Sequence, residues 1–170
     1  MRLFYALEFD RETKHSIALL QQDIEAYCPK YLFTPYENLH LTLCFLGEVE
    51  AHSLTLLKEI LFSLKASPFT LTFNQLKLWR KRKGDILWLG IEENRSLEAL
   101  QKELSYLLRM NNFMLDDRPF FPHVTLARGP KGKKLPAIEP LTVQSDKISL
   151  IHSQQKQNTL IHTPLITLQL

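Results

Sequence analysis

The sequence predicts an α+β fold with antiparallel sheets, and three observations lead to that class. Stretches with strand character and three stretches of helical spacing follow one another irregularly, unlike the regular strand–helix order of a parallel sheet. Turn residues join neighbouring strand stretches as hairpins, most clearly at Lys83-Gly84-Asp85. A pattern of His, an apolar residue, Thr and Leu occurs at positions 40 and 123, about half the 170-residue chain apart, which predicts two similar lobes.

The chain opens with a strand and a helix. Residues 3–9 are apolar and aromatic, which predicts a buried strand, and Asp10 is a suitable N-cap for the helix that follows. Apolar residues at helical spacing form the buried face of this helix, and Pro29 ends it. The next predicted elements are a short strand at 31–34, a turn at 35–38 and a strand at 39–46 that Gly47 closes.

The middle of the chain predicts two helices around a hairpin. Leucines and an isoleucine gather on one side of a helix over 50–65, and Ser67-Pro68 breaks it. Alternating apolar residues predict a strand over 69–79, which returns through a turn at 80–85 as a strand over 86–92. Asn94 then caps a third helix, whose leucine face continues to about residue 111.

The last third of the chain contains the second copy of the repeated motif. A loop rich in charge and proline precedes it, and a basic loop with glycines and prolines follows it. The predicted elements are a loop at 114–122, a strand at 123–128, a loop at 129–140 and two closing strands at 142–152 and 158–168.

Composition predicts one ordinary globular domain over residues 1–170. The hydrophobic share is 45% and the charged share 23%, while a net charge of +3 is too small to indicate nucleic-acid binding by itself. Cys28 and Cys44 form neither a metal pattern nor a disulfide framework. No apolar run approaches the ~20 residues of a membrane span. Since Glu8 and Asp10 stand where a signal peptide would continue apolar, we expect a cytoplasmic protein with no membrane partner, and a monomer.

The repeated motif places two polar side chains on one face of each predicted strand. Because alternate residues share a face, His40 and Thr42 point one way, as do His123 and Thr125, while their apolar neighbours point into the core. The unperturbed pKa of imidazole is about 6.5, so one histidine can accept a proton while the other donates one. The threonine hydroxyls can donate hydrogen bonds to an anion such as a phosphate. No metal or other cofactor is required.

A structural interpretation competes with this functional one. A single His-x-Thr in a strand is usually a hydrogen-bonded histidine on a half-exposed sheet, but its repetition in two similar contexts favours a function. The remaining histidines lack this context, and we assign His15, His52, His152 and His162 to the surface. Cys44 falls on the presumed face of the first motif, where a lone cysteine is more often a packing residue than a nucleophile.

The two motifs and their surroundings resemble the 2H phosphoesterase superfamily. Residues 37–49 (ENLHLTLCFLGEV) and 121–128 (FPHVTLAR) are similar to its RNA 2′,3′-cyclic phosphodiesterase branch, the 2′-5′ RNA ligase-like proteins. Residues 2–7 (RLFYAL), residues 86–90 (ILWLG) and Ser153 at the turn between the last two strands add to the likeness. The resemblance covers essentially the whole chain.

The resemblance implies a bilobal α+β fold in which two antiparallel sheets with outer helices flank a central groove. It implies metal-independent opening of RNA 2′,3′-cyclic phosphate ends to 2′-phosphates, without a cofactor, and a reversible 2′-5′ RNA ligation in bacterial members. His40 would be the proton donor and His123 the proton acceptor, although the residues alone leave the order of these roles open. Thr42 and Thr125 would bind the phosphate.

Two arginines near the second motif match the family less simply. Arg128 corresponds to an arginine that often follows the motif, but strict alternation puts it on the face of Val124 and Leu126 unless a β-bulge intervenes. A rim residue is the alternative role for this arginine. Arg118 stands one position out of step with the arginine that often precedes the motif.

Further candidates for RNA contact surround the two motifs. A basic hairpin tip and exposed aromatic residues suit RNA, although a solvated turn and core packing are the simpler interpretations. A second basic loop, with Lys131, Lys133 and Lys134, follows the second motif as a candidate flap over the groove. The contact candidates are Tyr36, Phe45, Arg80, Lys81, Arg82, Arg118, Phe120 and Phe121.

The sequence does not exclude two other functions. One is an RNA-binding module that has the fold without catalysis, and it would leave cyclic phosphate ends unchanged. The other is a 2H phosphodiesterase that acts on a small cyclic nucleotide or on a 2′-5′ oligoadenylate, which relative rates on the different substrates would reveal.

Overall fold

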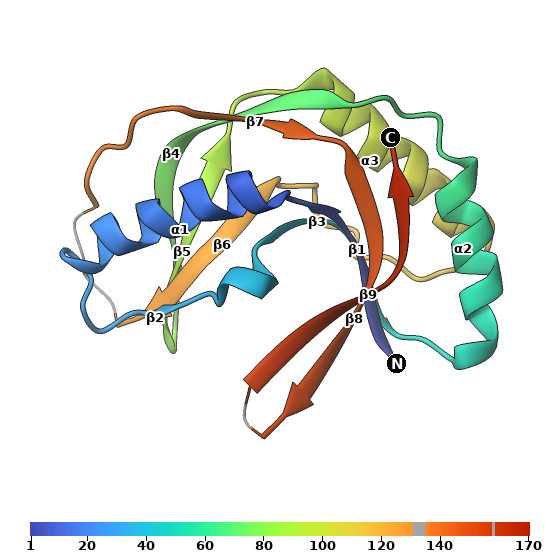
Figure 1. Cartoon of the computed structure of the whole chain (residues 1–170). Coiled ribbons are helices and arrows are strands. Elements are labelled where there is room, and N and C mark those ends of the chain that lie inside the picture. Colours follow the sequence, from blue (N-terminus) through green and yellow to red (C-terminus); the bar gives the residue numbers. More distant parts are fainter. Residues whose placement is uncertain (131–134, 158) are drawn as a thin grey trace.

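Two antiparallel sheets form the frame of the computed structural model, which describes residues 1–130, 135–157 and 159–170 (Figure 1). One sheet has four strands in the order β3-β1-β8-β9, and the other has five in the order β2-β6-β5-β4-β7. This confirms the α+β class. The elements are β1 (Arg2–Glu8), α1 (Arg11–Glu25), β2 (Leu32–Phe33), the 3₁₀ turn η1 (Tyr36–Asn38), β3 (His40–Glu48), the 3₁₀ turn η2 (Ala51–Ser53), α2 (Leu54–Ser63), β4 (Phe69–Lys81), β5 (Gly84–Ile91), α3 (Arg95–Met110), β6 (His123–Gly129), β7 (Leu141–Ser145), β8 (Lys147–Lys156) and β9 (Thr159–Gln169).

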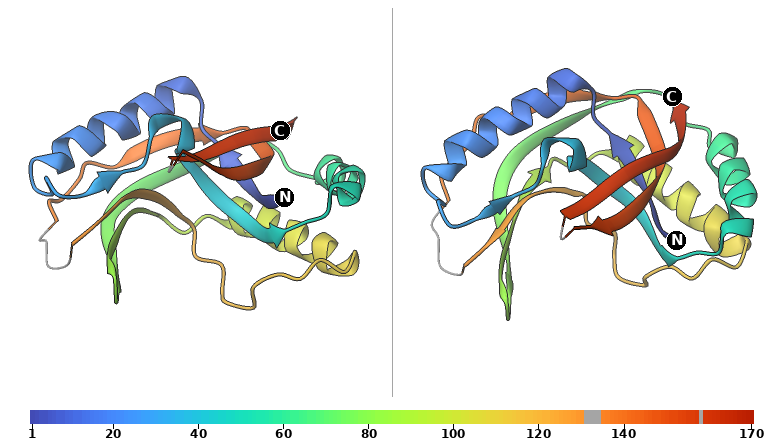
Figure 2. Two further views of the ribbon diagram at one scale, coloured as in Figure 1. Left: turned by 90° about the horizontal axis from the view of Figure 1, so that it is seen from below. Right: turned by 60° about the horizontal axis from the view of Figure 1, so that its bottom comes forward.

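The helices lie beside the sheets, with α1 next to the five-stranded sheet and α2 and α3 next to the four-stranded one (Figures 1 and 2). The predicted caps are present, because Asp10 Oδ1 accepts a hydrogen bond from the Thr13 amide at 2.7 Å and Asn94 Oδ1 accepts one from the Leu97 amide at 2.9 Å. Helix α2 is shorter than the predicted 50–65, since its first turn is the 3₁₀ turn η2. No helix among the described residues is long and apolar enough to cross a membrane.

The apolar face of each motif strand is buried, as the alternation predicts. Leu41, Val124 and Leu126 are fully buried, and Leu43 is nearly so. They pack into one core with the leucines of α3 and with Tyr5, whose hydroxyl donates to the Leu57 carbonyl at 2.7 Å. Burying these side chains leaves the opposite faces of β3 and β6 free to form a site.

Both motif strands contain a β-bulge at the same position. Opposite β1, the pairing moves from Ala6 with Thr42 to Tyr5 with Cys44, so Leu43 is the extra residue. Opposite β5, the pairing moves from Trp88 with Thr125 to Leu87 with Ala127, so Leu126 is the extra residue. Each bulge therefore lies three residues after the motif histidine, and each reverses the alternation beyond it.

The prediction of one strand over 142–152 is wrong, because the chain changes sheets within it. Strand β7 pairs with β4 in the five-stranded sheet, whereas β8 pairs with β1 in the four-stranded sheet. Asp146 lies at the crossing, where its carbonyl accepts hydrogen bonds from the Leu170 amide at 2.7 Å and the Gln169 side chain at 2.9 Å. The same apolar alternation suits both sheets, so it does not reveal the change.

The hairpin between β4 and β5 is tighter than the predicted turn at 80–85. Its strands continue to Lys81 and resume at Gly84, so only Arg82 and Lys83 form the turn. Gly84 has φ +140°, and a Cβ atom there would lie 2.6 Å from the Gly129 carbonyl oxygen on β6. Glycine is therefore required at this position by the backbone conformation and by the close approach of β6.

Replacing this glycine should destabilise the protein. We expect Gly84→Ala to lower the free energy of unfolding by about 1–3 kcal/mol, because the new Cβ combines backbone strain with a clash. Urea denaturation followed by circular dichroism measures the change. Lys83→Ala, an exposed change in the same turn, is the control and should alter the value by less than about 0.5 kcal/mol. Equal effects of the two substitutions would contradict the role of Gly84.

Candidate active site

Two strands from different sheets bring the motif residues to one cavity. His40 is the first residue of β3 and His123 the first residue of β6, and the two strands contact each other. His40, Thr42, His123 and Thr125 all line this first cavity, which has a volume of about 570 Å³. The four residues predicted to form the reacting centre are thus brought together, with one motif on each sheet.

Both imidazole rings are fixed in the same way. The Nδ1 atom of His40 lies 2.7 Å from the Asn38 carbonyl oxygen, and that of His123 lies 2.8 Å from the Phe121 carbonyl oxygen. A carbonyl oxygen only accepts hydrogen bonds, so Nδ1 carries the proton in each ring. Nε2 is then the atom that accepts or donates a proton. In His40 this atom lies 3.1 Å from Thr42 Oγ1.

Burial keeps both imidazoles neutral. It lowers the pKa of His40 to about 4, and the neighbouring imidazoles of His162 and His123 and the Lys14 ammonium lower it further, against the opposing effect of the bond to the Asn38 carbonyl. Burial likewise lowers the pKa of His123, with a smaller contribution from the Arg128 guanidinium. An anion between the rings would favour their charged forms and raise both pKa values.

Arg128 lines the same cavity because of the bulge at Leu126. Regular alternation would have turned this guanidinium to the core face, and the extra residue brings it to the face of the motif instead. The Leu126 carbonyl accepts hydrogen bonds from the Thr34 amide at 2.8 Å and from the Gln21 side chain at 3.0 Å. Helix α1 and the end of β2 therefore hold the bulge that positions Arg128.

The bulge at Leu43 has the opposite consequence for Cys44. Its expected position on the face of His40 and Thr42 is not observed, since Cys44 is 6% exposed and its Sγ lies 3.2 Å from Ser105 Oγ on α3. Burial raises the pKa of this thiol. Phe45, the next residue of β3, lines the first cavity in place of Cys44.

The assignment of His162 to the surface is wrong. This half-buried residue of β9 lines the first cavity, and its ring centroid lies 5.0 Å from that of His40 in an edge-to-face arrangement. The Phe4 ring contacts both imidazoles, at 4.9 Å from His40 and 5.1 Å from His162. Ser153, which the sequence placed at the turn, lies within β8 opposite His162. This pairing across the hairpin depends on the strand register, which the sequence pattern did not reveal.

Asn38 is another residue that the sequence interpretation missed. Its side chain is buried, donates to the Leu160 carbonyl at 2.7 Å and accepts from the His162 amide at 3.2 Å. Its own carbonyl holds His40. Asn38 therefore ties the β8–β9 hairpin to the first motif, although its position in a predicted turn gave no sign of this.

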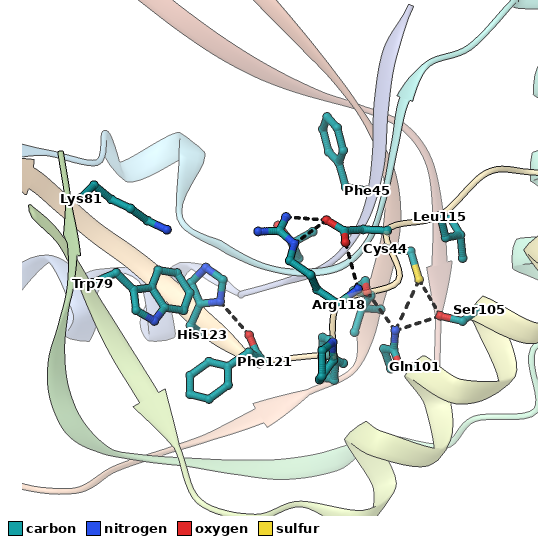
Figure 3. Close-up of a pocket in the computed structure, with 15 residues that line it drawn as sticks. Cys44, Phe45, Trp79, Lys81, Gln101, Ser105, Leu115, Arg118, Phe121 and His123 are labelled. Atoms are coloured by element: carbon teal, nitrogen blue, oxygen red, sulfur yellow. Dashed lines mark hydrogen bonds and ion pairs between the residues drawn. The ribbon is translucent and has the colours of Figure 1, made fainter. Parts of the chain in front are cut away.

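Aromatic side chains surround His123. The Trp79 ring centroid lies 4.4 Å from the imidazole and that of Trp88 lies 6.1 Å away, both edge to face. The Phe121 ring contacts both indoles, with centroids 5.8 Å from Trp79 and 5.1 Å from Trp88. Figure 3 shows Trp79 and Phe121 beside His123. These apolar rings contribute to the burial that keeps His123 neutral. The tryptophans were not among the predicted site residues.

Most of the RNA-contact candidates line a second cavity that adjoins the first. Phe45 lines the first cavity and also this second cavity of about 480 Å³. Arg80 pairs with the buried carboxylate of Asp85 at 3.3 Å, within the hairpin. The candidates that line only the second cavity are Lys81, Arg118, Phe120 and Phe121.

Other candidates line neither the first nor the second cavity. Tyr36 donates its hydroxyl hydrogen to the Arg11 carbonyl at 2.9 Å, and Arg82 is exposed in the hairpin turn. The basic loop with Lys131, Lys133 and Lys134 falls outside the described residues.

The arrangement suits acid–base chemistry on an anion. Two imidazoles on opposite walls can exchange protons through Nε2, while two threonine hydroxyls and a guanidinium donate hydrogen bonds into the same space. Among the described residues, no group of three or more His, Cys, Asp and Glu side chains is placed to hold a metal ion.

Comparison with known proteins gives a consistent result. The family model of the 2′-5′ RNA ligase superfamily matches residues 11–157. The chain is 32% identical over 130 residues to the RNA 2′,3′-cyclic phosphodiesterase of Escherichia coli K12, covering 75% of this chain and 71% of that protein. It is 31% identical over 133 residues to the Geobacillus stearothermophilus protein of the same name, covering 76% of this chain but only 42% of that longer protein.

A solved structure agrees along nearly the whole chain. The crystal structure of E. coli LigT complexed with 3′-AMP superposes with a TM-score of 0.85 and 27% sequence identity. The match covers 99% of this chain and 97% of that chain. The arrangement of the two sheets is therefore shared from end to end.

The contact between Asn38 and the last hairpin should contribute measurably to stability. We expect Asn38→Ala to lower the free energy of unfolding by about 1–3 kcal/mol, because the Leu160 carbonyl and the His162 amide lose a buried partner. Urea denaturation measures the loss. Asn74→Ala is the control, since the Asn74 amide donates to the exposed Glu92 carboxylate at 2.9 Å. A loss for Asn38→Ala no larger than that of the control would contradict the role given to Asn38.

Proposed function

The chain belongs to the 2′-5′ RNA ligase superfamily, and from this membership we propose that it is an RNA 2′,3′-cyclic phosphodiesterase. It hydrolyses the cyclic phosphate at an RNA end to a 2′-phosphate. The single observation that carries the proposal is the convergence of two identically fixed imidazoles on one cavity. The names of the E. coli and Geobacillus relatives support the same activity.

The proposed residues share the work of one phosphoryl transfer. Thr42, Thr125 and Arg128 donate hydrogen bonds to the two non-bridging phosphate oxygens, which carry the negative charge. His123 accepts a proton from water as the water oxygen forms its bond to phosphorus. The bond from phosphorus to the 3′ oxygen breaks, and His40 gives its proton to that oxygen.

The low pKa of His40 bears on its role as the proton donor. His40 has to carry a proton when the 3′ oxygen leaves, but its pKa of about 4 keeps it neutral near pH 7. The bound phosphate anion raises the pKa of His40, so that His40 takes up a proton. Substrate binding therefore also protonates the residue that acts as the acid.

The same residues can open the cyclic phosphate with another nucleophile. When an RNA 5′-hydroxyl takes the place of water, His123 accepts its proton as the 5′ oxygen bonds to phosphorus, the bond from phosphorus to the 3′ oxygen breaks, and His40 protonates that oxygen. The product is a 2′-5′ phosphodiester, and its cleavage is the reverse reaction. We propose this as a second, reversible activity of the same centre, supported by the family to which the chain belongs.

We further propose that residues 1–170 act as a single domain of two pseudo-symmetric lobes. In both motif strands the bulge lies three residues after the histidine, which supports the similarity of the two lobes. Both walls of the site come from one chain, which suits a monomer, and Cys28 and Cys44 are buried thiols that are not joined in a disulfide, which suits the cytoplasm.

Removal of either histidine should abolish most of the activity. We expect His40→Ala and His123→Ala each to lower kcat by about 10²–10⁴-fold on an oligonucleotide with a 2′,3′-cyclic phosphate end, because each removes a proton-transfer group. His52→Ala, at an exposed position, is the matched control.

The same assay separates the competing functions. EDTA should leave the rate unchanged. Near-wild-type rates in both histidine variants, or loss of activity on chelation, would refute the mechanism. Bound but unchanged RNA ends would favour a binding module, while faster turnover of a 2′-5′ oligoadenylate would favour another class of phosphodiesterase.

The pH dependence of kcat/KM should be bell-shaped with its maximum below pH 6.5. In the free enzyme the acceptor has to be neutral and the donor charged, and both pKa values are lowered from 6.5 by burial. Activity therefore falls at high pH as His40 loses its proton, and falls at low pH as His123 gains one. Initial rates at subsaturating substrate from pH 3.5 to 9 measure the profile. A rate that keeps rising to pH 9 would disprove the assignment.

A further inference from the structure

The second cavity lies on the His123 side of the proposed reacting centre. Thr42, Phe45 and His123 line both cavities, whereas His40 lines the first cavity and Trp79 lines the second. The remaining walls of the second cavity come from β4, from α3 and from the loop that precedes β6 (Figure 3). Its volume of about 480 Å³ is in the range of cavities that hold small organic ligands.

Aromatic rings form much of the wall of the second cavity. Trp79 and Phe121 lie together, with ring centroids 5.8 Å apart, and Phe120 comes from the same loop as Phe121. Phe121 is 52% exposed and Phe45 is 45% exposed. Exposed aromatic faces beside a reacting centre are suited to stacking a nucleobase, since every base presents a flat π-face.

Polar groups lie at the α3 end of the same cavity. Gln101 donates a hydrogen bond to Ser105 Oγ at 2.8 Å, and both side chains line the space beside Cys44 (Figure 3). Since the Gln101 amide nitrogen is engaged with Ser105, the Gln101 side-chain oxygen is the group that can accept a hydrogen bond from the edge of a base.

Two cationic side chains complete the lining. Lys81 extends from the end of β4, next to Trp79 and His123 in Figure 3. Arg118 lies on the opposite loop, where Asp116 fixes its guanidinium through Nε at 2.7 Å. Since Asp116 offsets the charge of Arg118, Lys81 is the cation with which we expect a backbone phosphate to pair.

We propose that this second cavity binds a second nucleotide of the RNA strand, adjacent to the nucleotide that carries the cyclic phosphate. The inference rests on the proposed function. His40, the proposed donor to the terminal 3′ oxygen, lines the first cavity, so the terminal ribose belongs there. The neighbouring nucleotide then reaches the second cavity across Thr42 and His123, with its base between the aromatic rings and its phosphate near Lys81.

The shortest substrate that fills both cavities is a dinucleotide. We expect the wild-type kcat/KM for adenylyl-adenosine 2′,3′-cyclic phosphate to exceed that for adenosine 2′,3′-cyclic phosphate by about 10-fold or more, the effect of stacking one base. We expect Lys81→Ala and Phe121→Leu each to reduce this ratio by at least about 3-fold. Phe121→Leu keeps the backbone carbonyl that holds His123.

Lys83→Ala is the matched control, because Lys83 is an exposed lysine in the turn of the same hairpin and lines neither the first nor the second cavity. It should leave the ratio unchanged. Quenching of tryptophan fluorescence by the unreactive dinucleoside monophosphate gives a second measurement, since Trp79 forms the wall; Lys81→Ala should weaken that binding and Lys83→Ala should not.

The outcomes distinguish this inference from the proposed function. A wild-type ratio near 1, or equal effects of Lys81→Ala and Lys83→Ala, would overturn the second subsite while leaving hydrolysis of the mononucleotide intact. Equal slowing of both substrates by Phe121→Leu, with the ratio unchanged, would also overturn the proposal. Failure of the folded wild-type protein to hydrolyse either substrate would instead reject the proposed function.

Discussion

A backbone carbonyl two residues upstream fixes each motif histidine, and this contact decides which ring nitrogen can exchange a proton. The bonds to Asn38 and Phe121 put the proton on Nδ1 in both rings and leave Nε2 as the atom that can accept or donate one. Because the partner is backbone, the orientation follows from the chain conformation entering each strand and needs no acidic side chain. An imidazole oriented without a carboxylate keeps a low pKa when buried, which agrees with the neutral state of both rings.

The two bulges adapt ordinary strands to this site. Without an extra residue at Leu43 and at Leu126, the alternation would bring Cys44 into the groove and turn Arg128 to the core. The bulges instead direct an aromatic ring on one wall and a guanidinium on the other, each five residues after its histidine. The same kind of bulge therefore gives the two walls different chemistry.

At Asp146 the chain passes directly from one sheet to the other. Strand β7 belongs to the five-stranded sheet and β8 to the four-stranded one, so a single residue connects the sheet of His123 with the sheet of His40. The hairpin that follows returns His162 to the first motif, where Asn38 holds its backbone. The surroundings of His40 are therefore assembled from both ends of the chain, and their burial accounts for its low pKa.

The sequence by itself determined the class of fold, the capped helices at Asp10 and Asn94, and the pairing of His40 with Thr42 and of His123 with Thr125. These features depend on side-chain period and on neighbours within a few positions, which a linear pattern records. Only the tertiary structure decided the bulges, the change of sheet and the approach of His162 to His40. Register is set by partners distant in the chain, and one unpaired residue reverses a face without altering the apolar pattern.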